Sequence, residues 1–211
     1  MPNQTTTTSN RQAHWDRVYT TKGETEVSWF QERPALSLDL FQAAGATPRS
    51  AVVDIGGGAS RLVDALVALG YEDVTVLDIA GAALDAARVR LGQKAASVRW
   101  LVADVTRWQP DRQYDLWHDR ATFHFLVDEA DRRAYVDTLR RALASGGHAV
   151  IGTFAPDGPE RCSGLPIVRY DPASLAATLG PDFALVESRR EAHQTPAGAI
   201  QSFNFGLFRR R

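Results

Sequence analysis

Four aspartates stand in or directly after short apolar runs of the sequence, at positions 54, 78, 104 and 119. Ionised carboxylates only accept hydrogen bonds, so they suit the hydroxyl and amine groups of a ligand. Asp78 could accept from both ribose hydroxyls of an adenosine, and Asp104 from the exocyclic amine of adenine. Because the carboxyl ends of neighbouring parallel strands share one crevice, we expect all four acids, Asp54 and Asp119 included, to line it. Each acid taken singly is equally explained by a helix cap or a solvated loop.

The glycine loop Gly56-Gly57-Gly58 follows the first of these acids and precedes a helical pattern. A turn without side chains lets a ligand approach the backbone, and the N–H groups that open the next helix attract polar or anionic groups. Ser60 keeps that approach tight and adds a hydroxyl. Arg61 occupies the position at which a dinucleotide fingerprint carries a further glycine, which disfavours NAD. A purely structural turn is the alternative for the loop by itself.

The elements that must position these residues alternate between short β-branched runs and helical patterns, which is typical of a parallel α/β sheet. The runs predict strands at residues 51–55, 74–77, 98–102, 114–117 and 148–154. Two further segments, 183–189 and 200–208, alternate like strands around the turn Thr195-Pro196-Ala197-Gly198, and they predict an antiparallel pair that finishes the sheet.

Apolar residues at helical spacing predict the elements between these strands. Helices are expected over residues 34–44, 62–69, 131–143 and 172–179. Gly70 should end the second of them, and Gly146-Gly147 should separate the third from the strand that follows.

The composition and charge of the chain indicate a single globular core and exclude several classes of partner and metal site. With 211 residues, 44% of them hydrophobic, the chain can bury one sizeable core. Its 24 basic and 25 acidic side chains leave a formal charge of −1, so it has no bulk attraction for nucleic acid or anionic lipid. Cys162 is the only cysteine, which excludes an internal disulfide or thiolate zinc cluster and fits a reducing cytoplasm.

No apolar run approaches the ~20 residues of a membrane span, and the first residues lack the pattern of a signal peptide. We therefore expect a cytoplasmic protein without a metal, and with neither nucleic acid nor a membrane as partner. The expected organisation is a flexible tail over residues 1–10 and a single domain over 11–211. Within that domain, 11–45 would form a helical lid, 46–154 a cofactor-binding core, and 155–211 an acceptor-side loop with the last strands.

Two motifs carry a resemblance to a known family. Val53-Asp54-Ile55-Gly56-Gly57-Gly58 resembles motif I of class I methyltransferases, and Val76-Leu77-Asp78-Ile79 resembles their acidic second motif. The resemblance covers nearly everything from His14 onward. It implies a Rossmann-like, doubly wound α/β sheet of seven strands, mostly parallel with a C-terminal antiparallel strand pair.

Three shorter segments narrow the resemblance. They are similar to the group that includes the elongation-factor and citrate synthase lysine methyltransferases. The three segments are His14-Trp15-Asp16-Arg17-Val18-Tyr19, Val27-Ser28-Trp29-Phe30 and Asp119-Arg120-Ala121-Thr122-Phe123. Trp117-His118-Asp119-Arg120 is also similar to thiopurine-type enzymes. Where lysine methyltransferases of this kind show Asp-Lys-Gly-Thr, this chain has Asp119-Arg120-Ala121-Thr122.

The resemblance implies S-adenosylmethionine as cofactor, with S-adenosylhomocysteine as product. The residues it implies for cofactor binding are Trp29, Asp54, Gly56, Gly57, Gly58, Ser60, Asp78, Ile79, Asp104, Val105 and Asp119. Asp54 is expected near the methionine amino group, and Asp119 beside the transferred methyl. If the acceptor must lose a proton, His118, His124 and Asp119 are candidate bases, of which we select His124 and Asp119 as catalytic. A packed structural role is the alternative for a lone histidine.

The expected function is methyl transfer to an N, S or O nucleophile of a small molecule, because the Asp-Lys-Gly-Thr signature is altered. A loop over residues 158–166, which contains Cys162, would lie on the acceptor side. Three alternatives stay open: protein lysine methylation, a non-catalytic module that binds S-adenosylmethionine, and a nicotinamide oxidoreductase.

Overall fold

The first and second strands of the sheet are short runs of β-branched and apolar residues that are buried on both faces. In the computed structural model, which describes the backbone of residues 4–211 and the side chains of residues 10–211, β1 (Val52–Ile55) and β2 (Val74–Asp78) are buried at every position. They pair in parallel, with Val52 opposite Val74. Such continuous burial requires a helical layer on each side of the sheet.

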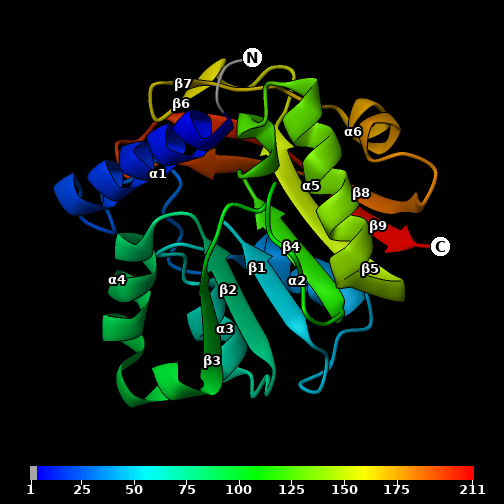
Figure 1. Cartoon of the computed structure of the whole chain (residues 1–211), viewed down its shortest axis with the longest axis horizontal. Helices are drawn as coiled ribbons and strands as arrows, with labels where there is room; N and C mark the ends of the chain where they lie inside the picture. The colour runs from blue at the N-terminus through cyan, green and yellow to red at the C-terminus, as the bar shows by residue number, and fades with distance from the viewer. Residues whose placement is uncertain (1–3) are drawn as a thin grey trace.

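The sheet has seven strands in the order β3-β2-β1-β4-β5-β9-β8 (Figure 1). The other five are β3 (Val98–Val102), β4 (Tyr114–Arg120), β5 (Leu143–Phe154), β8 (Phe183–Gln194) and β9 (Ile200–Arg210). The neighbouring strands β3, β2, β1, β4 and β5 all pair in parallel, whereas β9 runs antiparallel to both β5 and β8. The predicted mostly parallel sheet with a C-terminal antiparallel pair is confirmed.

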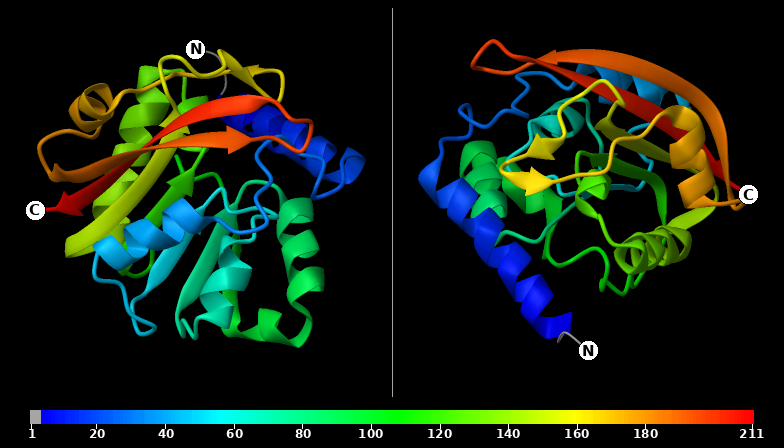
Figure 2. Two further views of the ribbon diagram at one scale, coloured as in Figure 1. Left: turned by 180° about the vertical axis from the view of Figure 1, so that it is seen from behind. Right: turned by 90° about the horizontal axis from the view of Figure 1, so that it is seen from above.

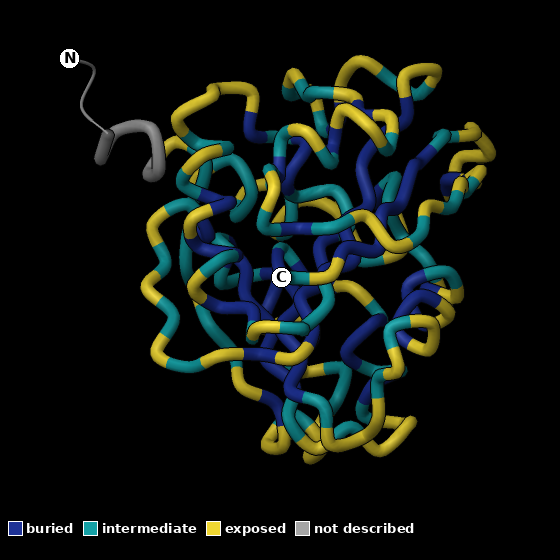
Figure 3. The backbone as a smooth tube through the Cα atoms, turned by 90° about the vertical axis from the view of Figure 1, so that its right-hand side faces the viewer, coloured by how far each residue is buried: buried dark blue, intermediate teal, exposed yellow. Residues whose placement is uncertain are grey.

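Helices cover both faces of the sheet (Figure 2). Leucines and a phenylalanine of α2 (Ala35–Ala43), α3 (Leu62–Ala68) and α4 (Gly81–Leu91) pack into one apolar core with β1 and β2. The opposite core receives α5 (Glu129–Ala142) and α6 (Pro172–Leu179). Buried residues lie toward the inside of the molecule, and exposed residues lie at its periphery, on loops and on the outer faces of helices and strands (Figure 3). The doubly wound arrangement is therefore present.

The strand order reverses at β1, which has β2 on one side and β4 on the other. The chains that leave β1 and β4 therefore diverge toward opposite directions of the sheet. In open α/β sheets this divergence opens a crevice at the carboxyl ends of the strands, where ligands bind. The glycine loop after β1 and the turn after β4 meet at this point.

Several elements differ from the sequence prediction. The helix α1 (Gln4–Thr21) begins inside the segment 1–10 that was predicted as a flexible tail, so that prediction is wrong from residue 4; residues 1–3 lie outside the described part. The helix α4 and a small hairpin of β6 (Arg161–Cys162) and β7 (Leu165–Pro166) were not predicted. The strand β5 begins directly after α5 and includes Gly146, which has φ 80°.

Within residues 4–211, no helix is both long and apolar enough to cross a bilayer. The described residues also contain no cluster of histidine, cysteine and acidic side chains suited to a metal ion.

Candidate functional site

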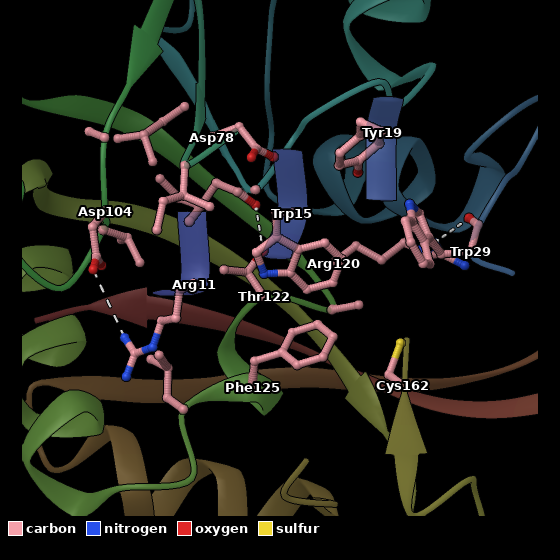
Figure 4. A pocket seen from close by; sticks show the side chains of 18 residues that line it. Arg11, Trp15, Tyr19, Trp29, Asp78, Asp104, Arg120, Thr122, Phe125 and Cys162 are labelled. Atoms are coloured by element: carbon pink, nitrogen blue, oxygen red, sulfur yellow. Dashed lines mark hydrogen bonds and ion pairs between the residues drawn. The ribbon is translucent and has the colours of Figure 1, made fainter. Parts of the chain in front are cut away.

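A pocket opens at the carboxyl ends of β1, β2, β3 and β4 (Figure 4). Side chains of α1, the loop at 22–34 and the β6 strand close it from the other side. A second recess, which shares Trp29, Gly56 and Arg120 with the pocket, continues along the glycine loop past Asp54 and Ser60. The site is thus built by the sheet edge below and by the N-terminal segment and the β6 strand above.

The glycine loop is tight because neighbouring side chains fill the space that a Cβ would need. A Cβ on Gly56 would lie 1.8 Å from Thr122 Oγ1, and one on Gly57 would lie 2.5 Å from Asp54 Oδ2. Gly56 and Gly58 also have positive φ, of 63° and 46°. The backbone turn itself is held by Gly56 N–H, which donates to the Leu77 carbonyl at 2.7 Å. Glycine is required at these positions on both steric and conformational grounds.

Asp78 ends β2 and lines the pocket with a nearly buried side chain. Its Oδ1 accepts from the backbone N–H of Ala80 at 2.8 Å. Burial raises the pKa of Asp78 to about 7, against the effect of that hydrogen bond. Burial, together with the negative charge of Asp78, also raises the pKa of Tyr19, whose neutral hydroxyl stays a donor. The pair offers an acceptor and a donor beside the glycine loop.

Asp104 lies further along the sheet edge, among the apolar pocket residues Ile79 and Val105. Its Oδ1 accepts from the backbone N–H and the hydroxyl of Thr106, at 2.9 and 2.7 Å. Its Oδ2 lies 3.9 Å from Arg11 Nη1 of α1 (Figure 4). Apolar pocket residues beside a carboxylate suit a base with an exocyclic amine.

Asp54 lies beneath the glycine loop with one satisfied and one unsatisfied oxygen. Its Oδ1 is 2.7 Å from His118 Nδ1, and His118 Nε2 is 2.8 Å from Ser37 Oγ. Its Oδ2 is buried and has no hydrogen-bond partner among the described residues. A buried carboxylate oxygen without a partner is costly, so a bound ammonium group would complete this site.

Ser60 lines the same recess, and its hydroxyl accepts from the Leu62 N–H at 3.1 Å, where α3 begins. Trp29 lines both the recess and the main pocket. Of the predicted cofactor residues, all except Gly58 and Asp119 line the pocket or the recess.

Asp119 lies under the site and not in it. The side chain is fully buried and accepts from Thr122 N–H at 2.8 Å and from the Tyr135 hydroxyl at 2.7 Å. Burial raises its pKa to about 6, although these hydrogen bonds oppose the rise. The pocket is lined by the next residues of the turn, Arg120, Ala121 and Thr122. Asp119 positions this turn, and its side chain does not line the pocket, so a role beside the transferred methyl stays a prediction.

His124 also lies away from the pocket. Its ring is fully buried against Phe125 and Phe154, and Nδ1 accepts from the Phe154 N–H at 3.4 Å. Burial, assisted by the positive charge of Arg120, lowers its pKa to about 3. A neutral histidine enclosed by aromatic rings has no path to an acceptor, so the geometry does not support its selection as a base.

Aromatic rings form the wall that faces the sheet edge. The Trp15 ring lies edge-on to Phe125 and to Trp29, with centroids 5.0 and 5.9 Å apart, and Tyr19 packs against Trp29 at 6.2 Å. Phe125 was not selected from the sequence, since it follows a strand by five residues with no spacing signal. Such a wall excludes water and can face a cation with its ring electrons.

Arg120 and Cys162 form the remaining side of the pocket (Figure 4). Burial raises the pKa of the Cys162 thiol to about 12, which keeps it neutral. The loop that carries Cys162 was expected on the acceptor side from the sequence, whereas Arg120 was not selected as a site residue, although it stands at the altered position of the Asp-Lys-Gly-Thr signature.

The chain is also similar in sequence to known methyltransferases. Residues 52–147 match a family model described as a methyltransferase domain. The chain is 32% identical over 123 residues to nodulation protein S of Rhizobium tropici, an alignment that covers 58% of this chain and 50% of that protein. It is 26% identical over 138 residues to the mouse eEF1A lysine and N-terminal methyltransferase, covering 65% of this chain and 19% of that protein.

Among solved structures, the chain is similar to the N-methyltransferase NodS of Bradyrhizobium japonicum WM9 in complex with S-adenosyl-L-homocysteine. The TM-score is 0.70 at 17% identity, and the match covers 93% of this chain and 96% of that one. The resemblance to seven-strand methyltransferases that the motifs indicated is thereby confirmed. The alignment spans about half the length of the Rhizobium tropici relative.

Proposed function

We propose that this chain, whose residues 52–147 match the methyltransferase domain family, is an S-adenosylmethionine-dependent methyltransferase that acts on an N, S or O nucleophile of a small molecule. The observation that carries the proposal is the unsatisfied Oδ2 of Asp54 in a recess continuous with Asp78 and Asp104. These three carboxylates follow one sheet edge, as an adenosine with an attached amino acid requires.

Three carboxylates are placed to accept hydrogen bonds from three parts of the cofactor. Asp104 would accept from the adenine amine, Asp78 from the ribose hydroxyls, and Asp54 from the methionine ammonium. The glycine loop packs closely against the residues that would hold the cofactor, since a Cβ on any of its three residues would lie within 3.0 Å of a neighbouring side chain. S-adenosylmethionine supplies a methyl carbon that is already activated by the neighbouring sulfonium.

The protein's own contribution to the reaction is orientation and exclusion of water. Trp15, Trp29 and Phe125 would shield the reacting end of the pocket, and Thr122 fixes the floor through its hydrogen bond to the Ile55 carbonyl at 3.2 Å. An acceptor would approach from the side of Arg120 and Cys162, with a lone pair aligned to the methyl carbon. The segment 11–45, with α1 and its following loop over the pocket, would serve as the lid.

A small acceptor is supported by the enclosure of this side. The pocket has walls from α1, from the loop that carries Trp29 and from the β6 strand that carries Cys162. Protein lysine methylation is the second candidate, and the similarity to the mouse eEF1A lysine and N-terminal methyltransferase supports it. We also propose a cytoplasmic location, for which the single, buried cysteine is the support.

Two measurements test the proposal. Calorimetry should show binding of S-adenosylhomocysteine and no binding of NAD, and the reverse result would support an oxidoreductase. Transfer of a labelled methyl group, assayed on lysate fractions separated by molecular weight, should label the small-molecule fraction. Label confined to protein would favour the lysine alternative, and cofactor binding without any transfer would indicate a non-catalytic module.

A further inference from the structure

Arg120 is a buried cation at the acceptor side of the pocket. It ends β4, its side chain is only 10% exposed, and it lines both the main pocket and the adjoining recess. Its Nη1 donates to the Trp29 carbonyl at 2.9 Å (Figure 4). Its Nε and Nη2 have no hydrogen-bond partner among the described residues. These two nitrogens form one edge of the guanidinium, which presents two parallel N–H donors.

Glu191 of β8 supplies the countercharge without satisfying that edge. Its Oε2 lies 3.6 Å from Arg120 Nη2, which is close enough for an ion pair but too long for a hydrogen bond. Its Oε1 accepts from Gln31 Nε2 at 2.9 Å, and Oε2 has no hydrogen-bond partner among the described residues. The hydrogen bond from Gln31 therefore holds the Glu191 carboxylate in place, and Oε2 remains a further hydrogen-bond acceptor.

The other groups packed around Arg120 add no charge to the pair that it forms with Glu191. The guanidinium lies over the Phe203 ring at 4.7 Å, and the Cys162 thiol is neutral. His193 Nε2 donates to the Ser28 carbonyl at 2.7 Å, and burial lowers the pKa of this histidine. The positive charge of Arg120 is thus matched by one carboxylate.

The Nε–Nη2 edge of Arg120 and the neighbouring Glu191 carboxylate determine which ligand group can bind there. Two buried N–H donors without partners carry a desolvation cost that a ligand acceptor atom would remove. A carboxylate would add a second negative charge next to Glu191, in a site that already contains Asp54 and Asp78. An uncharged carbonyl or ring nitrogen would satisfy the donors without that repulsion.

We propose that Arg120 and Glu191 together select methyl acceptors that present an uncharged hydrogen-bond acceptor, such as an amide or lactam carbonyl, and reject acceptors with a carboxylate at that place. The selection rests on the proposed function, because it assigns the acceptor side of the same pocket.

The test follows the side-chain Nε–H resonance of Arg120 by NMR in the protein saturated with S-adenosylhomocysteine. The resonance is assigned by its loss in Arg120→Lys, and calorimetry first establishes that the cofactor product binds. Two matched pairs of fragments are then titrated: benzamide against benzoate, and uracil against orotate. The expected result is that the neutral member of each pair shifts the resonance, with an affinity at least about tenfold above that of its anionic partner.

Removal of the charge of Glu191 tests whether this carboxylate sets the preference for neutral fragments. Glu191→Gln leaves Arg120 without its countercharge, so the preference should reverse in favour of benzoate and orotate. Glu187→Gln is the matched control, because Glu187 lies on the same strand in a more exposed pair with Arg189 and should keep the wild-type preference. Thermal melting confirms that both variants fold.

Three outcomes would overturn the proposal. The first is equal or stronger binding of the anionic fragments to the wild type, and the second is a resonance that none of the four fragments moves. The third is a shift caused by S-adenosylhomocysteine but not by its decarboxylated analogue, which would assign the edge to the cofactor's carboxylate. Failure of S-adenosylhomocysteine to bind in calorimetry would instead contradict the proposed function.

Discussion

Asp54 and His118 are joined across the two central strands by a contact of 2.7 Å between Oδ1 and Nδ1, and the two residues stand opposite each other in the β1–β4 register. The contact orients the carboxylate from below and leaves Oδ2 as the buried oxygen that has no partner among the described residues. The pair explains why an acid is useful in the middle of the buried strand β1. It fixes an acceptor at the place where the proposed methionine ammonium would lie.

Asp54→Asn should weaken binding of S-adenosylhomocysteine by about tenfold or more, because a charge-assisted hydrogen bond to the ammonium is lost. Methylthioadenosine, which lacks the amino acid part, should bind the variant and the wild type equally. Calorimetry with both ligands makes the comparison. A similar loss for the two ligands would mean that Asp54 acts on the loop and not on the ammonium.

The ionisation of Asp78 should link pH to stability. Burial raises the pKa of this group from 3.8 to about 7, so the folded state favours the protonated form. Its contribution to stability is fully present below the unfolded pKa and is lost as pH rises through about 7. Melting temperatures of the ligand-free protein from pH 4 to 8 should therefore fall more steeply with rising pH in the wild type than in Asp78→Asn. Parallel curves would show that Asp78 does not titrate in this range.

Gly56 should be far less tolerant of a side chain than Gly45, although both have positive φ. A Cβ on Gly45 meets nothing within 4 Å, whereas one on Gly56 would lie 1.8 Å from Thr122 Oγ1. Gly45→Ala should lose about 1 kcal/mol of unfolding free energy from backbone strain alone. Gly56→Ala should lose at least about 3 kcal/mol, or retain its fold only with the cofactor site displaced. Denaturant unfolding and calorimetry would report equal effects if the loop were an ordinary turn.

His124 should matter for stability and not for chemistry. His124→Gln disturbs the buried contact to the Phe154 N–H, which we expect to cost about 1–3 kcal/mol of unfolding free energy. Because the ring lies outside the pocket, the pH profile of methyl transfer should keep its shape, and S-adenosylhomocysteine should still bind. A folded variant whose turnover drops at least about a hundredfold with intact cofactor binding would restore His124 as a catalytic base.

Local patterns were sufficient to predict most of the sheet and the cofactor side of the site. The acids at 54, 78 and 104 follow apolar runs, and the parallel sheet brings such positions to one edge without further information. The helix over 172–179 was also predicted with its observed bounds. These features depend on residues near one another in the chain.

The remainder of the site depends on long-range packing. Asp119 was placed beside the methyl, yet alternation along β4 turns it toward Tyr135 while His118 faces Asp54. The ion pair of Arg120 with Glu191 joins residues far apart in the sequence and has no local signal. The helix α1 begins in a polar stretch, Gln4–Thr21, that composition alone assigned in part to a tail.

Titration of S-adenosylhomocysteine and of NAD into the wild-type protein and into Asp78→Ala determines whether the crevice binds the S-adenosylmethionine product through Asp78. We predict one-to-one binding of S-adenosylhomocysteine to the wild type, no binding of NAD, and a loss of about 1.5–3 kcal/mol of binding free energy in the variant as the ribose hydrogen bonds disappear. Asp85→Ala, which changes an exposed acid of α4, should bind as the wild type does. Binding of NAD without S-adenosylhomocysteine would show that the crevice is not an S-adenosylmethionine site, and an affinity unchanged in Asp78→Ala would show that Asp78 does not hold the ribose.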